Sequence, residues 1–237
     1  MSEGTPRRKP ITAGELLDKL EQDPAYIARM EKIERERQQA RMKYWRAARP
    51  MLEELAEAGF GVDSLDVFIN TNLNYKEAIP ILLRWLPRIE TRNVKSSIVR
   101  SLTIKWAKPA AAPPLIKEFY REDRDGLKWV IGNALSVVAD DSVFEEIVNI
   151  AQDKRHREGR QMVVVALGNM KNPKAVDLLI KLLDDDEVAP YAIAGLRKLG
   201  AKAQKARPYL DRFFAHPDPW VRNQAKRAIA KMDKAKK

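Results

Sequence analysis

The sequence predicts an all-α protein: an α-solenoid of about five helical hairpins behind an atypical helical N-terminal cap. Two observations support this prediction. Apolar residues recur in register at spacings of 29 to 33 residues along most of the chain. Pro residues recur near the starts of the repeated segments, and no alternating apolar run between turn dipeptides predicts a β-hairpin.

The composition narrows the possible classes of protein. The chain has 237 residues, of which 45% are hydrophobic, so material for a core is ample. It has no Cys, which excludes disulfides, thiolate metal sites and Cys nucleophiles and is compatible with a reducing compartment. No apolar stretch approaches the length of a membrane span, and no apolar run follows the basic N-terminus. We therefore expect a soluble, cytoplasmic protein.

The net charge of +11 gathers near the C-terminus, where residues 187–237 carry 13 basic and four acidic side chains. A polyanion, either nucleic acid or an acidic protein, is therefore a reasonable partner. The alternative is that the excess charge serves only to solvate the surface. Both interpretations stay open on composition alone.

The N-terminal part does not follow the repeat. Residues 1–11 are small, polar and basic, and we expect a disordered leader there. Residues 12–74 are expected to form the helical cap, as terminal units of solenoids differ from internal ones. Its first helix begins after Thr12, with Glu15 at capping-box spacing.

A long charged helix follows in this cap. Asp23 is placed to cap a helix over 25–48, whose exposed middle includes the i,i+4 pair Glu31–Arg35. We expect Pro50 to begin a separate third helix. The charged middle is either a solvated face or an arm that binds a partner, and its composition favours the solvated face.

The repeat occupies residues 75–232, with a short basic tail at 233–237. Its outer helices share one column of large apolar residues, namely Leu82, Leu115, Ile147, Leu179 and Leu210. Four residues later a second column holds Leu86, Phe119, Ala151, Leu183 and Phe214. Residues four apart share a helix face, so both columns are predicted to face the core.

The inner helices carry a matching column, namely Leu102, Leu135, Leu167, Leu196 and Ile229. The residue before each is small: Ser101, Ala134, Ala166, Gly195 and Ala228. Small side chains beside a large one allow neighbouring helices to approach closely. Such columns in register are the strongest signal in the sequence.

Helix pairs of this period resemble HEAT repeats of the short bacterial kind, like those of phycobilin lyases. The resemblance rests on an outer helix that opens near a Pro and an inner helix of Val-Arg/Lys-x-x-small-x-x-Ala-Leu type. It spans roughly residues 75–232. It implies an architecture, since HEAT repeats serve many functions. We expect a non-enzymatic scaffold that binds a partner protein, an acidic one because the chain is basic, on the concave inner-helix face.

One inner-helix position is basic in four repeats of five and defines the basic stripe: Lys95, Lys128, Arg160 and Arg222. If these side chains are free, they can bind a nucleic-acid backbone with low sequence specificity. Alternatively, each pairs with an acidic residue in the preceding turn: Glu90, Glu122 or Asp123, Asp153, and Asp218. Recurrence at one offset favours such a ladder.

Four more residues are candidates for partner binding. Arg155 and Arg157 lie in the basic loop 153–160. Trp129 and Trp220 lie near inner-helix ends beside basic residues, an arrangement suited to stacking on bases and equally to ordinary packing.

No catalytic residue, metal site or cofactor site is predicted. His156 and His216 lack metal-ligand spacing, and the chain has no glycine-rich phosphate loop. Alkylpurine DNA glycosylases with HEAT-like repeats offer a second alternative. Their aromatic-plus-Asp pattern is missing here, because no Asp shares the helix face of Trp129 in the next turn. We therefore do not expect an enzyme.

Overall fold

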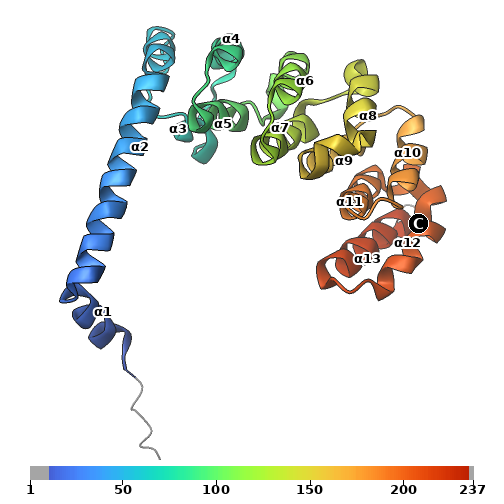
Figure 1. The fold of residues 1–237 in the computed structure, drawn as a ribbon. Helices are drawn as coiled ribbons and strands as arrows, with labels where there is room; N and C mark the ends of the chain where they lie inside the picture. Colours follow the sequence, from blue (N-terminus) through green and yellow to red (C-terminus); the bar gives the residue numbers. More distant parts are fainter. Residues whose placement is uncertain (1–10, 235–237) are drawn as a thin grey trace, which may run out of the picture. The chain divides into compact units, whose positions relative to one another are not determined.

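The computed structural model describes residues 11–234, and within this range every regular element is a helix (Figure 1). None of these helices is long and apolar enough to cross a membrane. The chain divides into two compact units, Met1–Ala47 and Ala48–Lys237. The expected leader at 1–11 and tail at 233–237 lie largely outside the described residues, and the domain boundaries drawn from the sequence stay a prediction.

The first unit contains α1 (Ala13–Glu21) and most of α2 (Pro24–Glu57). The predicted capping box is confirmed: the Thr12 hydroxyl accepts from the Glu15 amide at 3.3 Å, and the Glu15 carboxylate accepts from the Thr12 amide at 2.9 Å. Asp23 caps α2, also as predicted. These caps replace backbone partners that the first helical turn lacks.

The charged middle of α2 is exposed in the structure. Its predicted pair is present, with 3.7 Å between the Arg35 and Glu31 side chains, both largely exposed to solvent. Such a pair stabilises a helix by only about 0.3–0.5 kcal/mol.

The prediction that Pro50 begins a new helix is wrong, because α2 continues through it to Glu57. An internal Pro costs a helix roughly 3 kcal/mol through a lost amide donor and a clash with the preceding turn. Around it, Ala48, Met51 and Leu55 are fully buried. Burial of this face offsets the cost, as tertiary packing supplies most helix stability in proteins.

The second unit is a succession of helix pairs. After α3 (Asp66–Asn70), its outer helices are α4 (Ile79–Trp85), α6 (Ala112–Arg121), α8 (Phe144–Gln152), α10 (Lys174–Leu182) and α12 (Arg207–Leu210). Its inner helices are α5 (Arg92–Ser101), α7 (Asp125–Val138), α9 (Gln161–Leu167), α11 (Ala189–Leu199) and α13 (Pro219–Asp233). Each inner helix contacts the next, and the outer helices lie along one side of this row (Figure 1). The predicted α-solenoid of helical hairpins is confirmed.

Short 3₁₀ turns connect these helices or extend them. They are η1 (Lys76–Ala78), η2 (Leu86–Arg88), η3 (Lys105–Ala107), η4 (Asp141–Val143), η5 (Lys154–Arg160), η6 (Gly200–Ala206) and η7 (Asp211–Ala215). The tighter winding of a 3₁₀ helix changes which residues share a face.

The predicted columns form the core, with one exception. Every member of the first outer column and of the inner column is buried. In the second outer column, Phe214 is 41% exposed and Phe213 is buried instead. The reason is local: α12 ends at Leu210 and η7 follows, with three residues per turn, so the core face returns after three residues.

The small residues of the inner helices mark the closest approaches. A Cβ added to Gly168, at the end of α9, would lie 2.6 Å from the Gly195 Cα on α11. A Cβ on Gly195 would lie 2.9 Å from the Leu179 side chain. Backbone therefore faces backbone between these helices, and no side chain fits between them.

Gly168→Ala should destabilise the second unit by about 2 kcal/mol, because the new methyl group forces α9 and α11 apart. Urea unfolding followed by circular dichroism measures the change. Gly61→Ala is the matched control, since its Cβ would meet nothing within 4 Å. Equal loss of stability in both variants would contradict a close helix contact at Gly168.

Candidate binding site on the inner-helix face

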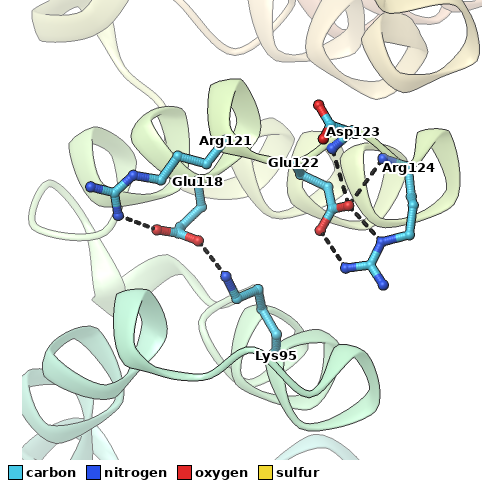
Figure 2. Close-up of polar contacts among 6 residues, drawn as sticks. All are labelled: Lys95, Glu118, Arg121, Glu122, Asp123 and Arg124. Carbon is cyan, nitrogen blue, oxygen red and sulfur yellow. Dashed lines mark hydrogen bonds and ion pairs between the residues drawn. The ribbon is translucent and has the colours of Figure 1, made fainter.

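The first residue of the basic stripe joins two repeats. Lys95 on α5 donates to the Glu118 carboxylate on α6 at 2.6 Å, and Arg121 reaches the same carboxylate at 3.0 Å (Figure 2). Glu118 is only 3% exposed. Because a buried carboxylate is costly without a cation, the Lys95 charge is engaged within the protein.

The acid expected to pair with Lys128 has another role. Glu122 holds Arg124, which donates through Nε at 2.7 Å and Nη2 at 3.0 Å (Figure 2). The Arg124 side chain, with the backbone amides of Arg124 and Asp123, lowers the pKa of Glu122 to about 2. This cluster shapes the turn into α7.

Lys128 pairs with a histidine instead. Its Nζ lies 3.2 Å from His156 Nδ1 and 5.3 Å from the centre of the Phe119 ring, and its side chain is almost wholly buried. His156 Nε2 lies 3.6 Å from Asp153. Burial, followed by the charge of Lys128, lowers the pKa of His156, which keeps the ring neutral and able to accept at Nδ1.

Arg160 is the most deeply buried member of the stripe, at 1% exposed. Its Nη2 lies 2.9 Å from Asp185 and 2.8 Å from Glu187, and Nη1 donates to the Ala151 carbonyl at 3.2 Å. The acidic run before α11 is therefore a structural ion-pair centre.

The fourth member stays within its own repeat. Arg222 donates to the carbonyls of His216 at 2.6 Å and Pro217 at 2.8 Å. The expected partner Asp218 instead caps α13 by accepting from the Trp220 amide at 2.7 Å.

All four side chains of the basic stripe are engaged within the protein, but the expectation of acidic partners in the preceding turn is wrong. Lys95, Lys128 and Arg160 reach forward to side chains of the following hairpin. The physical reason is burial: each cation lies at the junction between repeats, where the next hairpin supplies the group that compensates it.

The two loop arginines lie at the surface. The Arg155 side chain is 89% exposed and binds Asp153 at 2.7 Å, which lowers the pKa of Asp153. Arg157 is exposed and has a left-handed φ of 45°.

The structure brings the two candidate tryptophans together through a tyrosine that the sequence analysis missed. Trp129 and Trp220 are 38% and 47% exposed. Tyr191 on α11 lies with its ring 6.1 Å from that of Trp220, and Trp129 lies near enough to lower the pKa of the Tyr191 hydroxyl, against the larger opposite effect of burial. Aromatic side chains from α7, α11 and α13 thus lie near one another.

A sequence signal for this convergence exists. Each aromatic residue can be placed by its distance from the buried inner-helix column. Trp129 lies six residues before Leu135, and Tyr191 lies five before Leu196. Trp220 lies nine before Ile229. Positions that differ by three or four residues share a helix face, so the offset of Trp220 matches those of Trp129 and Tyr191. Aligning polar-face positions as well as core positions would have grouped the three.

Beside these aromatic residues lies a groove of ≈ 550 Å³, which we call the acidic groove. It is lined by Glu158, Gln161, Asp186, Glu187, Pro190, Tyr191, Asp218 and Trp220. Its four carboxylates stand at the N-terminal ends of α9, α11 and α13. The surface hollow nearest the candidate tryptophans is therefore negative, although the chain as a whole is basic.

Residues 112–200, which run from α6 to α11, match the HEAT repeat family. A designed armadillo repeat protein, YIII(Dq)4CqI, is similar in structure, with a TM-score of 0.44 and 15% identity, over 80% of this chain and 91% of that one. No curated protein matches the sequence. Within residues 11–234, no group of His, Asp and Glu is arranged to hold a metal ion.

Arg160→Ala should destabilise the second unit by about 3 kcal/mol, because it leaves Asp185 and Glu187 without their buried cation. Urea unfolding at neutral pH measures the loss. Arg155→Ala, on the exposed side of the same loop, should change stability by less than about 0.5 kcal/mol. An Arg160→Ala protein as stable as the wild type would contradict a structural role for the stripe.

Proposed function

We propose that this protein is a non-enzymatic scaffold that binds a partner protein through its inner-helix face. The observation that supports this most directly is the convergence of Trp129, Tyr191 and Trp220 beside an open groove. Aromatic residues are enriched where proteins bind one another, and they supply a large share of binding energy.

Exposure of a tryptophan alone does not define a site. Trp106 is also 38% exposed, yet it packs edge-on against Tyr75, with ring centres 5.6 Å apart, and lies outside the groove. The inner-helix site differs because Tyr191 and Trp220, from two repeats, line one hollow, and Trp129 of a third repeat lies close to Tyr191. Packing within a single repeat does not require that arrangement.

The charge of the groove argues against the acidic partner that the sequence favoured. The pairing of Lys95, Lys128 and Arg160 inside the protein leaves little of the stripe for an anionic ligand. The groove itself adds carboxylates. Both observations favour a partner that presents positive charge to this surface.

Affinity capture from the native cell tests the scaffold proposal, with nuclease treatment to remove contacts bridged by nucleic acid. Tyr191→Ala/Trp220→Ala should lose specific proteins that the wild type retains, because it removes the aromatic surface. Tyr209→Ala/Phe214→Ala removes two exposed aromatic residues away from the groove and should retain those proteins. If both double variants capture the same set as wild type, the inner-helix face is not the binding surface.

Binding to a nucleic-acid backbone is the second candidate function, and one cluster favours it. At the C-terminal end of α11, partial desolvation and the charges of Arg197, Lys108 and Lys231 lower the pKa of Lys198. Lys231 also donates to the Lys198 carbonyl at 3.4 Å. Four cations gathered in this way suit a phosphate better than the paired stripe does.

Duplex DNA binding at 50 and 200 mM salt tests this second candidate. If phosphates are bound, affinity should fall steeply with salt, and Lys198→Gln/Lys231→Gln should weaken binding and reduce the salt slope by about two. Lys174→Gln/Lys181→Gln on outer helix α10 is the control with the same charge change. Absence of binding at 50 mM salt would exclude the function.

A further inference from the structure

We infer that the acidic groove binds a lysine or arginine side chain carried by an extended basic segment of the partner protein. This inference rests on the proposed scaffold function and specifies the chemistry of its ligand. The expected partner is then basic, whereas the net positive charge of the whole chain suggests an acidic one.

The carboxylates of the groove divide into two kinds. Glu187 and Asp218 have internal roles, the first with Arg160 and the second as the cap of α13. Among the described residues, no hydrogen bond or ion pair joins the side chains of Glu158 and Asp186 to another group. These two negative charges stay available to a ligand, while the buried Arg160 lies behind the surface.

The aromatic residues decide which cations fit. The Tyr191 and Trp220 rings are tilted by 57° with centres 6.1 Å apart, so they do not stack on one another. Their faces can therefore receive an ammonium or guanidinium group, and Trp is the strongest partner for a cation. Glu158 lies near enough to raise the pKa of Tyr191, after the larger effect of burial. Aromatic face and carboxylate thus lie together in one site.

The carboxylates do not suit a metal ion. Within the described range they form no group able to hold one, although four of them line the groove. A metal ion needs several oxygens at about 2.0–2.6 Å from one point. An organic cation needs only separate carboxylates and an apolar wall along its stem, which Pro190 and the aromatic rings supply.

The shape of the groove favours a segment of chain over a small molecule. It is open, and its lining comes from the N-terminal ends of three successive inner helices. Its ≈ 550 Å³ exceeds what one side chain fills, which leaves room for flanking backbone. An extended peptide would place one basic side chain against the exposed faces of Tyr191 and Trp220 and the next beside the carboxylates.

The test uses the full-length chain and a fluorescein-labelled peptide of five Arg-Ala repeats, measured by fluorescence polarisation. The matched peptide carries citrulline at each arginine, which keeps the shape and removes the charge. We expect the arginine peptide to bind at 50 mM salt, to bind more weakly at 300 mM, and to exceed the citrulline peptide at least tenfold.

Two variants and one control locate the binding. Glu158→Gln/Asp186→Asn should weaken the arginine peptide about fivefold, because it removes two exposed charges. Trp220→Ala should weaken it about tenfold through the lost cation–aromatic contact. Glu145→Gln/Glu146→Gln makes the same charge change on outer helix α8 and should leave affinity within twofold.

Three outcomes overturn the inference: equal binding of the citrulline peptide, equal weakening by the α8 control, or unchanged binding by both groove variants. Tighter binding of the corresponding Glu-Ala peptide also overturns it and indicates an acidic partner. Failure here leaves the scaffold proposal intact if Tyr191→Ala/Trp220→Ala still loses captured proteins. If the peptide binds but the capture experiment fails, the groove is a cation site and the protein does not act as a scaffold through it.

Discussion

The close approach of consecutive inner helices is the constraint on which the rest of the structure depends. At Gly168 and Gly195, backbone meets backbone with no side chain between. Each helix pair is too small to bury its own apolar faces, so it gains stability only by contact with its neighbours. The small residues Gly168 and Gly195 allow the short distance between α9 and α11. The positions of the outer helices, the buried charges and the exposed aromatic residues all follow from that distance.

Buried charge is the second consequence of this packing. Lys128 and Arg160 lie at junctions where water is largely excluded. The hairpin that follows supplies carboxylates to Arg160 and the neutral His156 ring to Lys128. Such pairs add little net stability compared with apolar packing, but a missing partner is costly. They therefore favour one order and one register of neighbouring repeats. The sequence pattern resembles a ligand-binding stripe. In the structure, Lys95, Lys128 and Arg160 instead connect neighbouring repeats.

The acidic groove arises from the ends of the same helices. Carboxylates at the starts of α9, α11 and α13 interact favourably with the helix dipoles, so repeats stacked in parallel gather negative charge along one edge. Lys108, Arg197, Lys198 and Lys231 gather instead near helix C-terminal ends. A chain with a net charge of +11 can thus present a negative surface where its aromatic residues converge. Net charge describes the molecule as a whole and says little about one groove.

The sequence by itself determined the repeat, the inner and outer helices, the core columns and the Thr12 capping box, because these depend on local periodicity and spacing. Tertiary structure decided the rest. Pro50 stays within α2 because its neighbours are buried, and Phe213 replaces Phe214 in the core because a 3₁₀ turn shortens the period. Trp129 and Trp220 were found as candidates, but their meeting through Tyr191 joins three repeats. Periodicity along the chain fixes which face a residue occupies, whereas the partners across repeats depend on how closely the helices approach.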